Sequence, residues 1–149
     1  MNVLDELDGY QITQRGLDCY GHLEPGAPED FRQLAALLVD YWIEGDYRLI
    51  GIGGGQGSGK STLCRLIASA FKHVGEKVAV LGIDDFYLPT NERLRLASEV
   101  HPLMATRGPP GTHDVDKLLK NIDMLIDGGS VRVPVFDKAK DDRVGNRRI

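Results

Sequence analysis

The chain has 149 residues, of which 42% are hydrophobic and 27% charged, and its formal net charge is −4. This length suits one domain with a core of its own, and the composition excludes wholesale disorder. No apolar stretch is long enough to span a bilayer, the acidic start lacks the basic region of an export signal, and two cysteines make no disulfide framework. We therefore expect a cytoplasmic protein without a membrane segment. There is also no basic run or basic–aromatic stripe of the kind that binds nucleic acid.

Residues 1–46 are predicted to form a helical segment that packs on a sheet built by residues 47–149. Glycine and proline punctuate residues 1–27, so short helical or irregular structure is expected there. A helix then opens at Pro28 or Glu29 and closes near Gly45. Its apolar face consists of Phe31, Leu34, Ala35, Leu38, Tyr41 and Trp42.

The stretch from Gly54 to Thr62 fits the pattern G-x-x-x-x-G-K-[ST] of a phosphate-binding P-loop. Glycine lets such a loop aim successive backbone N–H groups at a triphosphate, and the following helix points its N-terminus at the same phosphates. Lys60 is expected to place its charge on the β- and γ-phosphates, and the Ser61 hydroxyl to bind Mg²⁺. The residues expected to bind ATP are Gly54, Gly55, Gln56, Gly57, Ser58, Gly59, Lys60, Ser61 and Thr62.

The flanks of the loop fit this reading. Residues 47–53 read as a buried strand, and helical spacing of apolar residues runs from Leu63 to Val74, with Gly75 at the helix end. A second continuous apolar run, residues 77–83, is typical of a parallel strand covered on both faces. It ends in Asp84-Asp85-Phe86-Tyr87, which places two carboxylates where ligand crevices of open α/β sheets lie.

The rest of the chain is predicted to alternate between helices and extended segments. Residues 91–100 read as a short helix, residues 101–113 as a loop, and the next helix, capped by Thr112 or Asp114, runs to Ile126. Residues 131–136 are extended, with Pro134 indicating an edge strand. The tail, residues 137–149, is charged and shows no apolar periodicity. The predicted fold class is therefore α/β, a P-loop NTPase-type three-layer α/β/α arrangement with a parallel sheet.

Four segments in this order carry a resemblance to a known family: the P-loop, Ile83–Tyr87, Arg107–Asp114 and Val133–Lys138. Together they resemble the glycerate kinase branch of the P-loop kinases, which include pantothenate kinase, uridine kinase and phosphoribulokinase. The resemblance implies an ATP- and Mg²⁺-dependent kinase whose small-molecule acceptor is glycerate. It also implies catalytic roles for Lys60 and Asp84, with Asp85 as the fallback. Further roles implied are acceptor binding by Tyr87, Arg107, His113 and Lys138. An acid beside the metal can serve two roles, so Asp84 is also a candidate Mg²⁺ ligand together with Ser61 of the P-loop.

Several readings stay open on the residues alone. The acids after the second strand could be a Walker B metal site, or solvated turn residues, and Asp114 could be a helix cap without a chemical role. Instead of a small-molecule kinase, the chain could be an NTPase or a nucleotide-binding fragment without turnover. Its oligomeric state and base preference are not encoded in any pattern we recognise.

The end of the chain departs from the resembled family. In that family a further apolar strand ending in Glu-Gly follows the segment that corresponds to Val133–Lys138. Here the sequence resembles the family through Asp142-Arg143, and residues 144–149 differ from it. We therefore expect a chain that is incomplete at its C-terminus. Its three-stranded parallel sheet (residues 47–53, 77–83 and 131–136) would leave the P-loop strand bare on one side. Such a chain should bind ATP weakly and phosphorylate glycerate poorly or not at all.

Overall fold

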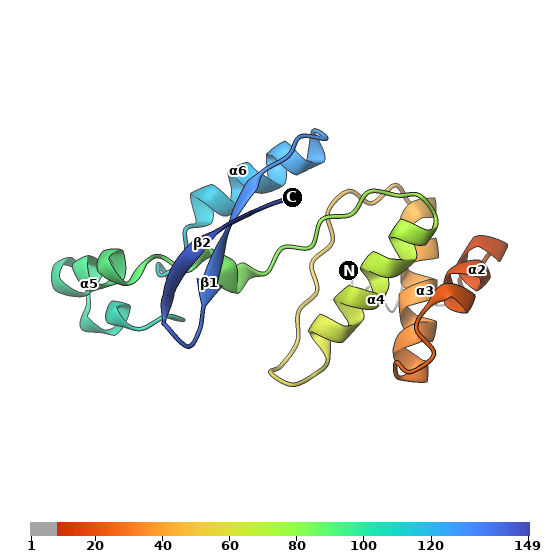
Figure 1. Cartoon of the computed structure of the whole chain (residues 1–149), viewed down its shortest axis with the longest axis horizontal. Coiled ribbons are helices and arrows are strands. Elements are labelled where there is room, and N and C mark those ends of the chain that lie inside the picture. The colour runs from red at the N-terminus through yellow and green to blue at the C-terminus, as the bar shows by residue number, and fades with distance from the viewer. Residues whose placement is uncertain (1–8) are drawn as a thin grey trace. The chain divides into compact units, whose positions relative to one another are not determined.

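The computed structural model describes residues 9–149, which divide into two compact units, one ending at Val80 and the other running from Leu81 to Ile149 (Figure 1). In the first unit the described helices are α2 (Gln14–His22), α3 (Glu29–Glu44) and α4 (Lys60–His73). The second unit holds η1 (Ile83–Phe86), α5 (Thr90–Glu99), η2 (Pro102–Ala105), α6 (Val115–Ile126), β1 (Arg132–Asp137) and β2 (Asp142–Arg148). None of the helices in the described part of the chain is long and apolar enough to cross a membrane.

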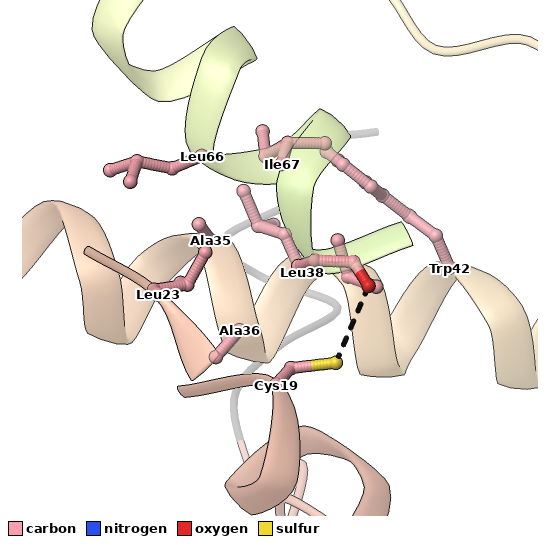
Figure 2. Close-up of a cluster of buried hydrophobic side chains, with 10 residues drawn as sticks. Cys19, Leu23, Ala35, Ala36, Leu38, Trp42, Leu66 and Ile67 are labelled. Carbon is pink, nitrogen blue, oxygen red and sulfur yellow. Dashed lines mark hydrogen bonds between the residues drawn. The ribbon is translucent and has the colours of Figure 1, made fainter. Parts of the chain in front are cut away.

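The core of the first unit lies where α2, α3 and α4 meet (Figure 2). Helix α3 contributes Leu38 and Trp42 from the apolar face that its sequence predicts, and α4 contributes Leu66 and Ile67. Small residues such as Ala35, Ala36 and Ala70 are fully buried and let the helices approach closely. The Cys19 thiol points into this core and lies 3.8 Å from the Ala70 carbonyl oxygen, so it is a packing residue.

A buried carboxylate ties α3 to the segment that leads into α2. Asp40 is fully buried, and its two oxygens accept hydrogen bonds from the Thr13 amide (2.7 Å), the Thr13 hydroxyl (2.7 Å), the Tyr10 hydroxyl (3.1 Å) and Arg15 Nε (2.9 Å). Burial alone would raise the pKa of Asp40, but these donors outweigh it and hold the pKa below its usual range. The network therefore compensates a charge that would otherwise be costly to bury.

The second unit is built on an antiparallel hairpin of β1 and β2, whose register runs from Arg132↔Arg148 to Asp137↔Asp142 with a bulge at Val135/Phe136. Val131 and Val133 pack with the fully buried Phe86 of η1, and Leu118 and Leu125 of α6 border this cluster. Helix α6 begins and ends where the sequence predicts, and the Asp114 carboxylate caps it by accepting from the Lys117 amide at 3.2 Å.

The prediction of a parallel sheet is not confirmed in the described residues. Residues 47–53 and 77–82 are assigned to no strand, and the sole ladder in residues 9–149 is the β1–β2 hairpin. A parallel strand needs a neighbouring strand for its ladder and cover for its side chains, and most residues of these segments are exposed. Leu49 and Val78, for example, are 62% and 41% exposed. The charged tail, expected to lack regular structure, instead forms β2. The short turn between β1 and β2 brings the two strands together, and β2 shows no apolar alternation that would predict this pairing.

The helix predictions are confirmed for α3, α4, α5 and α6, each to within a few residues, and α2 is the helical part expected within residues 1–27. The expectations for residues 1–8 lie outside the described residues. The predicted division at residue 46 and the packing of residues 1–46 on a sheet stay predictions.

We predict that Asp40→Asn lowers the free energy of unfolding of the first unit by about 2 kcal/mol, because an amide cannot satisfy four converging donors. Trp42, the only tryptophan of the sequence and 5% exposed, reports this unfolding by its fluorescence in urea. Asp18→Asn is the control, since Asp18 is exposed and, within residues 9–149, its side chain bonds only Gln14 of its own helix. Equal effects of the two substitutions would contradict the assigned role of Asp40.

The difference between wild type and Asp40→Asn should depend on pH. Because the folded-state pKa of Asp40 lies below the unfolded value of about 3.9, its contribution is complete above about pH 5 and is lost as the pH falls through the folded-state value.

Candidate active site

The loop before α4 has the backbone that phosphate binding requires. Gly57 and Gly59 have φ of 77° and 84°, and Gly59 is the left-handed residue from which α4 starts. A Cβ on Gly59 would also lie 2.5 Å from the Phe31 ring, so glycine is needed there for space as well as for conformation. No side chain caps the start of α4, which leaves its first amides for a ligand.

Lys60 closes over this loop. Its ammonium donates to the carbonyl oxygens of Gly54 (2.8 Å) and Gly55 (2.5 Å). A Cβ on Gly54 would meet Ser58 Oγ at 3.0 Å, so the loop is tight around the lysine. An ammonium held by neutral carbonyls readily exchanges them for phosphate oxygens, which are stronger acceptors. With the bare amides of α4, this arrangement fits a bound polyphosphate.

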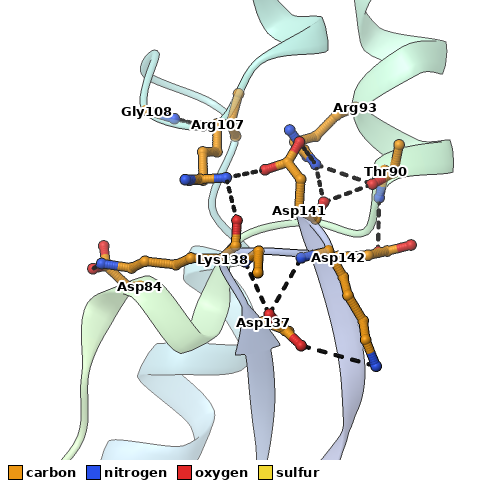
Figure 3. Close-up of polar contacts among 12 residues, drawn as sticks. Asp84, Thr90, Arg93, Arg107, Gly108, Asp137, Lys138, Asp141 and Asp142 are labelled. Atoms are coloured by element: carbon orange, nitrogen blue, oxygen red, sulfur yellow. Dashed lines mark hydrogen bonds and ion pairs between the residues drawn. The ribbon is translucent and has the colours of Figure 1, made fainter.

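In the second unit, Asp84 projects from η1 and pairs with Lys138, with Asp84 Oδ2 2.6 Å from Lys138 Nζ (Figure 3). Hydrogen bonding and charge from Lys138 lower the pKa of Asp84, burial opposes this, and the Tyr87 hydroxyl adds to the lowering. The two side chains are 46% and 62% exposed, so water screens the pair and its contribution to stability is small. Because this ion pair contributes little to stability, its two side chains are available for another role.

Tyr87 and His113 lie beside Asp84. Their rings stack with centroids 4.1 Å apart, the two residues form a lone antiparallel bridge, and the Tyr87 ring meets Phe136 edge-on at 5.3 Å. Burial lowers the pKa of His113, and Asp84 opposes that shift. Nε2 of His113 is buried and has no hydrogen-bond partner in the described structure, so a bound water or ligand would satisfy it.

Arg107 reaches the same cluster through the turn between β1 and β2. Its Nη1 donates to the Lys138 carbonyl oxygen at 3.3 Å and to Asp141 Oδ1. The structure thus brings together five residues predicted for catalysis or acceptor binding: Asp84, Tyr87, Arg107, His113 and Lys138.

Asp85, the fallback for the catalytic acid, has a different environment. Its Oδ1 accepts from the Phe136 amide at 3.4 Å, and its Oδ2 lies 3.5 Å from Arg147 Nη2, so it binds both strands of the hairpin. Asp84 is the acid that faces the other candidate residues. The roles of Ser61 and Asp84 toward Mg²⁺ join residues of different units and stay predictions. In the described residues no three His, Cys, Asp or Glu side chains group as metal ligands.

Sequence reasoning missed the residues that hold this cluster in place, chiefly Arg93 and Asp141. Arg93 is fully buried and bonds the turn through Asp141, while Arg143 Nε donates to the Tyr87 carbonyl oxygen at 2.8 Å. No local pattern distinguishes a buried arginine from the solvated arginines usual on a short helix. For Asp141 and Arg143, the one sequence signal of a role was the high density of charged residues in the tail, residues 137–149.

The sequence pattern of the Phosphoribulokinase / Uridine kinase family matches residues 49–149, and the chain belongs to this family. Its members are ATP-dependent kinases that phosphorylate small molecules. The resemblance inferred from the P-loop and the three later segments is therefore confirmed. So is the family's fold, although the parallel sheet is absent from the described residues.

Two curated relatives and one solved structure illustrate the similarity. The uncharacterized kinase mug58 of Schizosaccharomyces pombe is 38% identical over 108 residues, which are 70% of this chain and 39% of that protein. The chloroplastic D-glycerate 3-kinase of Arabidopsis thaliana is 30% identical over 105 residues, 66% of this chain and 23% of the relative. The structure of the YGR205w protein is similar with a TM-score of 0.65 and 29% identity, over 81% of this chain and 48% of that one. The chain thus spans less than half the length of each.

We predict that Asp84→Asn lowers the pKa of His113 further, because the Asp84 charge opposes the effect of burial. The His113 ring resonances, followed by NMR through a pH titration, measure this shift. Asp116→Asn on α6, which is exposed, is the control and should leave the titration unchanged. An unchanged or raised pKa in Asp84→Asn would show that the two residues are not neighbours.

Proposed function

We propose that the chain binds ATP with residues 54–62 and directs the γ-phosphate to a hydroxyl of a small acid held beside Asp84, and that this acid is glycerate. Membership of the kinase family supports phosphoryl transfer. The observation that supports the acceptor is the cluster itself, in which Asp84 pairs with Lys138 and the Arg107 guanidinium, paired with Asp141, bonds the Lys138 carbonyl oxygen. A hydroxy acid has the complementary groups, a carboxylate for the cations and a hydroxyl for Asp84.

In the proposed reaction Asp84 orients the acceptor hydroxyl and takes its proton as oxygen attacks the γ-phosphorus. The bond between the γ-phosphorus and the β,γ-bridging oxygen breaks, and ADP leaves with that electron pair. Lys60 follows the charge that develops on the transferred group. Mg²⁺, when bound with ATP, would neutralise phosphate charge, and the oxygens of Ser61 and Asp84 are the ligands we expect for it.

The Asp84–Lys138 pair gives this mechanism a dependence on the acceptor. While the pair is intact, the pKa of Asp84 is lowered and the carboxylate is a weak base. An acceptor carboxylate that draws Lys138 toward itself would let the pKa of Asp84 rise as the hydroxyl arrives. Transfer would then be slow without the acid, which limits hydrolysis of ATP.

Two other functions predict different behaviour. An NTPase would release ADP at a rate that no small acid changes, and a nucleotide-binding fragment would bind ATP without releasing ADP. A panel of hydroxy acids and neutral alcohols, with direct binding and ADP release measured in parallel, separates the three. The kinase proposal expects ADP release that rises with glycerate above the rate without an acceptor.

We predict that MgATP raises the thermal unfolding midpoint of the wild-type chain and that Lys60→Ala removes most of this rise, since the ammonium contributes directly to phosphate binding. Trp42 fluorescence reads the unit that contains the loop. Lys72→Ala, in the last turn of the same helix, is the control and should keep the full rise. A full rise in Lys60→Ala would contradict the assignment of the loop.

We further predict that Asp84→Asn lowers the acceptor-stimulated part of ADP release by about 10²–10⁴-fold and leaves ATP binding nearly intact, as expected for a positioned base. Asp85→Asn should lower it less and should instead destabilise the second unit, whose hairpin it binds. The reverse order would make Asp85 the catalytic carboxylate.

A further inference from the structure

The guanidinium of Arg93 is the most completely enclosed charge of the second unit. It is fully buried, and it donates to the carbonyl oxygens of Leu88 (3.1 Å) and Ala105 (3.0 Å) and to the Thr90 hydroxyl (3.1 Å). Its remaining hydrogen bonds are with Asp141, to the carbonyl oxygen at 2.5 Å and to Oδ2 at 2.9 Å. These contacts fix α5, η2 and the hairpin turn to one planar group (Figure 3).

Asp141 is correspondingly constrained. It sits in the turn between β1 and β2 with φ of 53°, a left-handed conformation that few non-glycine residues adopt. One carboxylate oxygen pairs with Arg93 and the other with Arg107, and hydrogen bonding to Arg93, then to Arg107, lowers the pKa of Asp141 although burial opposes it. A carboxylate shared by two guanidiniums has little freedom to move.

The constrained Asp141 carboxylate in turn restrains Arg107, the residue expected to bind the acceptor. Asp141 and the Lys138 carbonyl oxygen both contact Nη1 of Arg107. Its Nε and Nη2 have no hydrogen-bond partner in the part of the chain that the structure describes, and the guanidinium lies 6.0 Å from the centroid of the Phe136 ring. These two nitrogens form the edge of a guanidinium that binds a carboxylate through two parallel hydrogen bonds.

We propose that Arg93 and Asp141 are positioning residues for acceptor recognition: Arg93 fixes Asp141, and Asp141 holds Arg107 by Nη1 so that its Nε–Nη2 edge binds the carboxylate of the acceptor. This inference rests on the proposed function only in that the acceptor is an acid. It makes the preference for an acid over a neutral alcohol, which Arg107 provides, depend also on two residues that do not touch the acceptor. The ligand class is therefore a small carboxylate with a neighbouring hydroxyl.

The test measures binding of glycerate and of glyceramide, its uncharged counterpart, by calorimetry or NMR titration. Asp141→Asn should weaken glycerate binding by about tenfold, or about 1.4 kcal/mol, with little change for glyceramide or MgATP. Arg93→Lys, which keeps the charge but loses the planar fork, should have the same selective effect. The control is Arg95→Lys, because Arg95 is exposed on the same helix and pairs only with Glu99 at 3.9 Å.

A double-mutant cycle separates positioning from general loss of structure. Arg107→Met should abolish the preference for glycerate over glyceramide, and in that background Asp141→Asn should weaken glycerate binding no further. Additive losses, or equal weakening of glycerate and glyceramide, would overturn the inference. An unchanged His113 titration in Asp141→Asn verifies that the neighbouring fold is intact.

Binding distinguishes this inference from the kinase proposal. If glycerate binds with the expected dependence on Asp141 but never stimulates ADP release, the kinase proposal fails and the positioning role stands. If the wild-type chain binds glycerate no better than glyceramide, the positioning role is overturned, whatever the rate of ADP release.

Discussion

The second unit depends on arginine side chains that bind backbone carbonyl oxygens. The segment around Tyr87 forms a lone bridge with His113, and Arg143 of β2 adds bonds to the carbonyl oxygens of Tyr87 (2.8 Å) and Phe86 (3.3 Å), the latter also bonded by the Asp114 amide (2.8 Å). Arg93 does the same for Leu88 and Ala105 from α5. This arrangement also sets the position of Asp84, because Asp84 directly precedes the anchored segment and pairs with Lys138 of the hairpin turn.

The sequence was most informative where a local rule decides the outcome. The Asp114 cap and the apolar spacing behind it predict α6 at its observed ends, and the glycines of the P-loop predict the left-handed start of α4. Asp84 and its neighbours were found by resemblance of short motifs. Long-range partners decide the rest: residues 47–53 carry an apolar strand pattern, but such a pattern becomes a strand only when a neighbour pairs with it.

The hairpin and Arg93 are the opposite case, in which structure forms where the sequence shows no pattern for it. Strand β2 is charged and shows no alternation, yet it pairs with β1 across a short turn in which Asp137 accepts from the amides of Ala139 and Lys140. Arg93 belongs to a helix with an ordinary surface composition and is nevertheless fully buried. The hairpin depends on local bonds of its turn, whereas the burial of Arg93 depends on Asp141, a residue distant in sequence that no single-sequence pattern connects to it.

The most direct measurement of the central claim is a heteronuclear NMR titration of the 149-residue chain with glycerate, followed by MgATP. The account predicts that glycerate shifts the side-chain resonances of Arg107, Lys138 and His113, and that MgATP alone shifts those of the 54–62 loop. Glycerate shifts confined to the loop, or absent from the Asp84 cluster, would contradict the claim that this cluster binds the acceptor.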